Sequence, residues 1–356
     1  MRGVALLARY NQMSETELVT AIQQAKQSLG RSVTILGHHY QRDEVIQFAD
    51  YRGDSLELSR RAAQVKEARY IVFCGVHFMA ETAAILCQPE QVVIQPVIEA
   101  MCPMAHMANV ADAERAWEEL SALWPGKLVP ITYQNSTAAL KAFVGRRGGA
   151  VCTSANASKL FKWAFQKGDH ILFTPDEHLG TNTALAMGIP SEEIGIWDPL
   201  HPPKPESLAR CRIVVWKGFC YVHTAFTPEE VDEVRRKYPG ALIIVHPECV
   251  REVVAKADLA ASTSGIVQAV ERAPKGAVIA IGTEWHLVHR LQQEHPDKTV
   301  IPLRHSVCVN MAMTRMPHLL YVLEGLVQGE VRNVVSVDPE TAQWARLALE
   351  RMLEAS

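Results

Sequence analysis

The stretch SVTILGHHYQRDEVIQFADYRGDS, from Ser32 to Ser55, sets the pattern from which the fold can be predicted. Its β-branched, apolar beginning, Ser32–Leu36, predicts a buried strand. The polar motif His38-His39-Tyr40 follows the strand, and a helix-like segment then leads to the turn Gly53-Asp54-Ser55. Apolar strands that alternate with helical segments are typical of parallel sheets covered by helices on both faces.

Similar apolar runs recur along the whole chain and predict the same arrangement elsewhere. Helical patterns separate them, for example at Ala111–Leu123 and Pro228–Tyr238. Asp338 before Pro339 is expected to cap a C-terminal helix. The fold class is therefore expected to be α/β. Further strands are expected at Tyr70–Phe73, Leu128–Thr132, His170–Phe173, Ile213–Val215, Ala241–Val245, Val278–Ile281 and Thr299–Leu303.

The motifs that follow these runs occur three times in the same order. From the first motif to its serine there are 16 to 21 residues, and from that serine to a histidine 22 to 24. From the histidine to the cysteine the spacing is much longer in the second set, from His178 to Cys220, than in the other two. This interval contains the Pro-rich segment 198–205, which is expected to be a surface loop. The three sets are His38-His39-Tyr40, Gly53-Asp54-Ser55, Gly75-Val76-His77-Phe78 and Cys102; Tyr133-Gln134-Asn135, Thr153-Ser154-Ala155-Asn156, Asp176-Glu177-His178-Leu179-Gly180 and Cys220; and His246-Pro247-Glu248, Ser262-Thr263-Ser264-Gly265, Gly282-Thr283-Glu284-Trp285-His286 and Cys308.

This repeat predicts three similar α/β/α lobes with short parallel sheets around a pseudo-threefold axis. The lobes are expected at residues 1–108, 109–223 and 224–356, with the C-terminal helix in the third. Ligands bind at the carboxyl ends of parallel strands, where these motifs lie. We therefore expect a central active site.

The overall composition restricts the classes of partner. The chain has 356 residues and a formal net charge of −3, with Lys and Arg spread along it. Neither nucleic acid nor an anionic membrane is expected as a partner. The start, MRGVALLARYNQM, has no long apolar core, and the apolar stretch Tyr70–Cys87 contains His77 and Glu81, so neither a signal peptide nor a membrane span is expected. A cytoplasmic protein is expected.

Three of the eight cysteines have a common place in the repeat. Cys102, Cys220 and Cys308 each close one set, so the symmetry could bring their thiolates together. Three thiolates would bind a 4Fe-4S cluster and leave one iron open to act as a Lewis acid. The alternative is three buried structural thiols. No CxxC pair occurs, which argues against zinc ribbons.

Eight segments together resemble quinolinate synthase, and the similarity extends from about residue 20 to residue 325. The combination is specific, although any one segment alone would be weak. The family's fold, three α/β lobes with one cluster cysteine per lobe, agrees with the repeat. The segments are HHYQRDEVIQFADYRGDSLELSR, GVHFMAETAAIL, VCTSANASK, WKGFCYVH, VHPEC, ADLAASTSG, IGTEWHL and CVNMAM.

The resemblance implies that the chain condenses iminoaspartate with dihydroxyacetone phosphate to quinolinate. It also implies an L-aspartate oxidase or dehydrogenase as the supplier of iminoaspartate. Some members carry a CxxC pair just before the last ligand cysteine. In this chain the stretch reads His305-Ser306-Val307-Cys308 instead. A redox switch of that kind is therefore not expected.

The resemblance also suggests roles for individual residues. Tyr40 and Glu248 would be acid/base groups, and His223 would face the open iron; packing is the alternative for His223. Tyr133 and Asn135 would line the triose side. The turns with Ser55, Ser154, Ser262 and Thr263 are expected to open helices, whose N-termini attract anions. Plain helix capping is the alternative for these hydroxyls. The residues implied to hold the carboxylates and the phosphate are His38, Ser55, Ser154, His246 and Thr263.

Three other classes of protein stay open. The same ligands could serve another dehydratase with an open iron, of the aconitase type. An iron–sulfur sensor would need a partner surface or a DNA-binding signal, and neither is evident. A zinc protein with Cys and His ligands is the third.

Overall fold

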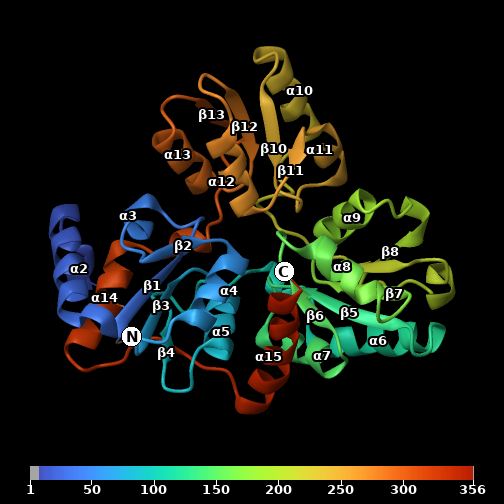
Figure 1. The fold of residues 1–356 in the computed structure, drawn as a ribbon, viewed down its shortest axis with the longest axis horizontal. Helices are drawn as coiled ribbons and strands as arrows, with labels where there is room; N and C mark the ends of the chain where they lie inside the picture. Colours follow the sequence, from blue (N-terminus) through green and yellow to red (C-terminus); the bar gives the residue numbers. More distant parts are fainter. Residues whose placement is uncertain (1–7, 356) are drawn as a thin grey trace. The chain divides into compact units, whose positions relative to one another are not determined.

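The computed structural model describes residues 8–355, which form two compact units (Figure 1). The first unit consists of Met1–Cys102 and Cys308–Val337, and the second of Pro103–Val307 and Asp338–Ser356. The expectation about the start of the chain falls partly on residues 1–7, outside the described part. Among the described residues, no helix is both long and apolar enough to cross a membrane.

The first unit contains one five-stranded sheet in the order β14-β4-β3-β1-β2. All neighbours pair in parallel except β14, which pairs antiparallel with β4. Helix α2 begins with a capping box formed by Ser14 and Glu17, and its apolar face packs against α14. The elements of this unit are α2 (Glu15–Leu29), η1 (Gly30–Ser32), β1 (Val33–His38), α3 (Asp43–Ile46), β2 (Tyr51–Gly53), α4 (Ser55–Gln64), β3 (Tyr70–Cys74), α5 (His77–Leu86), β4 (Val92–Ile94), η5 (Met311–Met313), α14 (Met316–Val327) and β14 (Val334–Val335).

The second unit begins with a parallel sheet of five strands, in the order β6-β5-β7-β9-β8. Its central strand β7 is buried almost throughout, as expected for a strand covered on both faces. The elements are η2 (Met104–His106), α6 (Val110–Leu123), β5 (Leu128–Tyr133), α7 (Ala138–Arg146), β6 (Ala150–Cys152), α8 (Ala157–Phe165), β7 (His170–Thr174), α9 (Glu177–Ala186), η3 (Ser191–Glu193), β8 (Ile194–Trp197), η4 (Pro205–Leu208) and β9 (Ile213–Trp216).

A second parallel sheet in the same unit has four strands, in the order β11-β10-β12-β13. The chain then leaves for the first unit and returns with the last helix, α15, which packs against α7. Gly145 in α7 makes this contact possible, because a Cβ there would collide with the carbonyl oxygen of Trp344. The elements are α10 (Pro228–Lys237), β10 (Leu242–Val245), α11 (Arg251–Lys256), β11 (Leu259–Ala260), α12 (Thr263–Arg272), β12 (Val278–Gly282), α13 (Trp285–Glu294), β13 (Thr299–Pro302) and α15 (Pro339–Glu354).

The three sheets share one strand order. Each has a core in which the first strand along the chain lies between the second and the third, with the fourth beyond the third: β2-β1-β3-β4, β6-β5-β7-β9 and β11-β10-β12-β13. Strand β8 is an addition to the second sheet, and β14 to the first. The expected α/β class with short parallel sheets is confirmed.

All eight strands expected from the sequence are present, and none of their ends differs from the expected one by more than two residues. The Pro-rich segment 198–205 is a surface loop as expected, with Leu200 83% exposed. Asp338 caps α15 through the backbone N–H of Thr341.

The division into lobes at residues 108 and 223 stays a prediction. The segment 308–337, which that division assigns to the third lobe, instead adds α14 and β14 to the first compact unit. The physical reason is pairing that is distant in sequence: β14 completes the edge beside β4, and α14 covers α2.

Candidate active site

The eight cysteines fall into two groups by exposure. Cys102, Cys220 and Cys308, the three expected as ligands, are half-buried. Burial raises the pKa of Cys74 to about 12 and also raises the pKa of Cys152, Cys211 and Cys249. A metal needs the thiolate, so the buried thiols are poor ligands and the half-buried ones are better. The five buried cysteines are Cys74, Cys87, Cys152, Cys211 and Cys249.

The three half-buried cysteines lie at similar places along the chain. Each follows the fourth strand of a sheet core and lies outside strand and helix. The backbone N–H of Thr224 donates to the carbonyl of Cys220 at 2.9 Å, and that of Ala312 to Cys308 at 3.0 Å. The short helix η2 follows Cys102 directly. These positions and exposures fit thiolate ligands of an iron–sulfur cluster.

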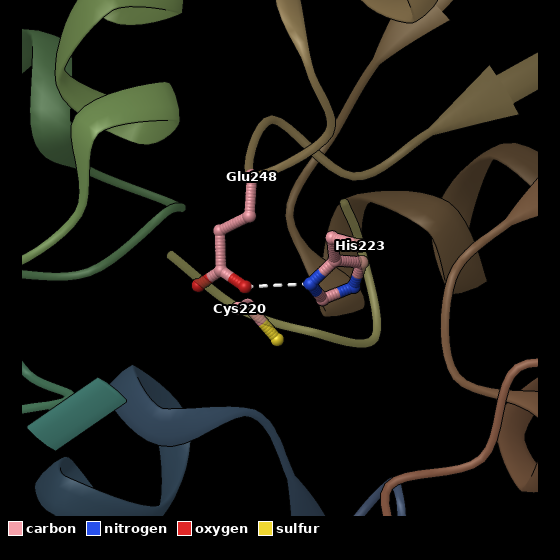
Figure 2. Close-up of side chains that lie close together, drawn as sticks. All are labelled: Cys220, His223 and Glu248. Carbon is pink, nitrogen blue, oxygen red and sulfur yellow. Dashed lines mark hydrogen bonds and ion pairs between the residues drawn. The ribbon is translucent and has the colours of Figure 1, made fainter. Parts of the chain in front are cut away.

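In the second unit, Cys220 lies beside a buried pair of acid and base (Figure 2). Donor atoms of Cys220, His223 and Glu248 all lie within 4.8 Å of one another. His223 Nδ1 is 2.6 Å from Glu248 Oε2, and its Nε2 is 3.0 Å from the hydroxyl of Thr283. Both ring nitrogens of His223 are thus engaged, which fixes the orientation of the ring.

His246 extends this cluster and lies against both His223 and Glu248. The two rings stack with centroids 4.3 Å apart. The backbone N–H of Glu248 donates to His246 Nδ1 at 3.3 Å, and His246 Nε2 is 3.2 Å from the hydroxyl of Ser154. Because Nδ1 accepts, the neutral ring carries its proton on Nε2 and can donate it to an oxygen.

The buried groups have strongly shifted pKa values. Burial and the charge of His223 lower the pKa of His246 to about 3, although Glu248 acts in the opposite direction. Burial raises the pKa of Glu248, but His246, His223 and hydrogen bonds from His223 and Tyr133 outweigh it and lower the pKa to about 2. His246 is neutral near pH 7, so His223 and the hydrogen bonds are the lowering causes that remain there. Glu248 is therefore a buried carboxylate at neutral pH.

In the first unit, His38 and Tyr40 adopt the same turn as His246 and Glu248. The backbone N–H of Tyr40 donates to His38 Nδ1 at 3.1 Å, and the two rings meet edge to face at 4.7 Å. Both side chains are at least nine-tenths buried. The repeat thus places an Nε2–H donor at the end of β1 and another just after β10.

The hydroxyl groups of the four candidate anion-binding residues, Ser55, Ser154, Ser262 and Thr263, have different structural roles. Ser262 is the N-cap of α12 and accepts from the N–H of Gly265, so the capping alternative holds there. Thr263 and Ser55 are the first residues of their helices, and Asp54 supplies the cap beside Ser55. Ser154 precedes α8 in a loop and contacts His246. For these three, capping is not the explanation of the hydroxyl.

Tyr133 and Asn135 follow β5 in a compact loop. Tyr133 is buried and bonds to Glu248, whereas Asn135 is half-buried. Asn135 Oδ1 is shielded from solvent and has no hydrogen-bond partner among the described residues. An oxygen in that state is suited to accept a hydrogen bond from a ligand.

Two histidines of the repeat, His77 and His286, lie within hydrogen-bond distance of neighbouring side chains. His77 Nδ1 lies 2.8 Å from Gln95 Oε1, and His286 Nδ1 lies 2.8 Å from Glu284 Oε1. Two further buried residues, Thr283 and Asp176, were not expected to take part in the cluster. Both are in the repeated motifs, and that was their only sequence signal.

Comparison with known proteins agrees with the sequence pattern. Residues 20–354 match the family described as Quinolinate synthetase A protein. Proteins named quinolinate synthase from Bacillus anthracis (strain CDC 684 / NRRL 3495), Bacillus cereus (strain AH187) and Bacillus thuringiensis subsp. konkukian (strain 97-27) are each 49% identical to this chain over 351 residues, which is 97% of this chain and 95% of theirs. The chain therefore belongs to the quinolinate synthase family of NAD biosynthesis.

Proposed function

We propose that this protein condenses iminoaspartate with dihydroxyacetone phosphate to quinolinate, with release of phosphate and water. The family membership supports the product, and the buried group of Cys220, His223 and Glu248 supports a site that combines a metal ligand with acid/base chemistry. This group is the observation on which the proposal depends.

The proposal assigns one 4Fe-4S cluster to Cys102, Cys220 and Cys308. It depends on the three-lobed arrangement with a pseudo-threefold axis that the repeat predicts. The contrast between these half-buried thiols and the five buried ones supports the assignment. When bound, a cluster with three protein ligands would supply an open iron that acts as a Lewis acid toward a substrate oxygen.

Both substrates are anionic, and the chain offers hydrogen-bond donors for them. His38 and His246 each present an Nε2–H, because their Nδ1 atoms accept from the backbone. Ser55 and Thr263 lie at the N-termini of ten-residue helices, where backbone N–H groups and the helix dipole favour anions. Ser154, Tyr133 and Asn135 complete the proposed substrate residues. Ser262 is also a proposed substrate residue, because it lies in the turn directly before Thr263, although its hydroxyl caps α12.

Proton transfer is assigned to Glu248 and Tyr40. Glu248 is ionised and buried, and one of its oxygens, Oε1, has no hydrogen-bond partner among the described residues, so it can accept a proton from substrate carbon or nitrogen. His223 orients Glu248 through the bond at 2.6 Å and, in this proposal, faces the metal-bound ligand. Tyr40 would act on the opposite reactant as a hydroxyl donor.

The decisive experiment is anaerobic reconstitution with iron and sulfide, followed by incubation with dihydroxyacetone phosphate, oxaloacetate and ammonia. Quinolinate in the products is the expected result, and its absence with a full cluster present would refute the proposal. The open iron should also make activity sensitive to oxygen. The supplier of iminoaspartate would be an L-aspartate oxidase or dehydrogenase in the same cytoplasm.

A zinc site is the second candidate, because Cys, His and Glu donors within 4.8 Å also suit zinc. The hydrogen bonds of both His223 nitrogens argue against it, since a metal would have to displace one of them. Metal analysis and the absorption spectrum of protein purified without oxygen separate the two, because zinc gives no visible absorption.

A further inference from the structure

The turn that carries Cys220 is fastened on both sides by hydrogen bonds from buried side chains. Trp216, the last residue of β9, donates its indole Nε1–H to the carbonyl oxygen of Met107 at 2.8 Å. On the other side of the turn, the hydroxyl of Ser306 donates to the carbonyl oxygen of Val222 at 2.8 Å. The proposed chemistry uses neither of these two donors.

The two bonds join segments of chain that adjoin all three proposed cluster ligands. Met107 follows Cys102 by five residues, and Ser306 precedes Cys308 by two. Cys220 lies between the residues at the other ends of the two bonds. The bonded partners are 109 and 84 residues apart in sequence, so neither bond is part of a local turn.

The bonded residues all belong to the second compact unit. The division between the units falls directly after Cys102 and directly before Cys308. Two residues of chain cover at most about 7 Å and five residues at most about 18 Å. The bond at Ser306 therefore restricts the position of Cys308 closely, and the bond at Met107 restricts that of Cys102 less closely.

Ser306 is itself held in place through its backbone. Its N–H donates to the carbonyl oxygen of Arg304 at 3.0 Å, and its carbonyl accepts from the N–H of Trp285, at the start of α13, at 2.8 Å. Ser306 is 8% exposed, and Val222 is 2% exposed. Loss of the hydroxyl would take this donor from a buried carbonyl, which costs more than the bond itself contributes.

The contact at Met107 is close and involves a second bond. The backbone N–H of Phe219 donates to Met107 Sδ at 3.3 Å. Gly218 permits this approach, since a Cβ there would lie 2.2 Å from the carbonyl oxygen of Pro175 and 3.2 Å from Met107 Cβ. Trp216 has no exposed surface, so packing fixes the direction of its N–H.

We propose that Ser306 and Trp216 are positioning residues for the cluster, because they hold the segments next to Cys102 and Cys308 against the Cys220 turn. This rests on the proposed assignment of one 4Fe-4S cluster to these cysteines. Thiolates that are distant in sequence bind one cluster tightly only when their segments are held in place. Loss of either bond should therefore make the cluster more labile, although every ligand is kept.

Iron release from anaerobically reconstituted protein to the chelator bathophenanthroline tests the role of Ser306 without turnover. Ser306→Ala should release iron about 10- to 100-fold faster than the wild type. Ser136→Ala is the matched control, because Ser136 is also buried and donates to the carbonyl oxygen of Tyr133 at 2.7 Å, but this bond lies within one loop. Its rate should stay near that of the wild type. An equal acceleration in Ser136→Ala, or none in Ser306→Ala, overturns the proposal.

Trp216→Phe tests the other bond, because it keeps an aromatic ring and removes the Nε1–H. Trp197→Phe is its control, since Trp197 is also buried and lies opposite Trp216 on the neighbouring strand β8. Trp216→Phe should release iron about tenfold faster than Trp197→Phe, and equal rates overturn the role of Trp216.

The same preparations separate this proposal from the proposed function. If iron release is as expected but the loaded wild type forms no quinolinate, the proposed function fails while the positioning role stands. A wild type that takes up no cluster overturns both.

Discussion

His223 and Glu248 form a buried pair in which Nδ1 lies 2.6 Å from Oε2 and each side chain is only 2% exposed. The two residues are 25 positions apart, one after β9 and the other after β10. The pair therefore connects the ends of strands from both sheets of the second unit. Its position beside Cys220 makes it the best place to test the proposed chemistry.

Glu248→Gln should retain the cluster but lower the rate of quinolinate formation by about 100- to 10,000-fold, because an amide does not accept the proton. Gln keeps the shape and can still bond to His223. Iron and sulfide content are measured beside the rate. A variant with nearly normal turnover would remove Glu248 from its role as base.

Replacement of Cys102, Cys220 or Cys308 by Ser should abolish both cluster and activity, since a hydroxyl is a poor ligand for iron. Cys87→Ser and Cys211→Ser are the controls, because both thiols are buried. The measurement is the visible spectrum after anaerobic reconstitution. A complete cluster in Cys220→Ser would contradict the ligand assignment.

Ser154→Ala and Ser262→Ala should separate binding from helix capping. Ser262→Ala removes the N-cap of α12 and should cost about 0.5–2 kcal/mol of stability. Ser154→Ala removes the partner of His246 and should raise KM by about tenfold or less with little change in the urea midpoint. If Ser154→Ala instead lowers the urea midpoint and leaves KM unchanged, its hydroxyl is structural.

Acid should destabilise the protein partly through His246. Its pKa is about 3 in the folded state, so between the ordinary histidine value and pH 3 only the unfolded chain binds the proton. Stability is fully present above about pH 6.5 and falls by at most about 1.4 kcal/mol per pH unit below it for this group. His246→Gln should flatten that dependence in urea unfolding at several pH values. His201→Gln, at an exposed histidine, should leave it as in the wild type.

The sequence predicts the fold well where strands are long and apolar. The missed strands β2, β4, β6, β11 and β14 have two or three residues each, too few to show a pattern. Strand β8, which ends directly before the Pro-rich segment 198–205, was missed as well. The return of β14 to β4 could not be inferred, because it depends on pairing between residues 240 positions apart rather than on local composition.

The site was predicted in its residue types but not in its contacts. The family resemblance marked Glu248 as a candidate, yet its bond to His223 depends on how two sheets pack. Asp176 went unassigned because burial is not visible in a sequence. The candidate ligand cysteines could be chosen by their place in the repeat, and their role as ligands stays a prediction.

The contact between α2 and α14 has a consequence for biogenesis. Helix α2 packs against α14, and just before α2 the hydroxyl of Tyr10 donates to Glu324 at 2.8 Å, across 314 residues of chain. All strands of the second unit lie between Leu128 and Pro302 and leave the ribosome before α14 does. The apolar side of α2 therefore lacks its partner helix during most of translation. During that interval it is a natural client surface for a chaperone.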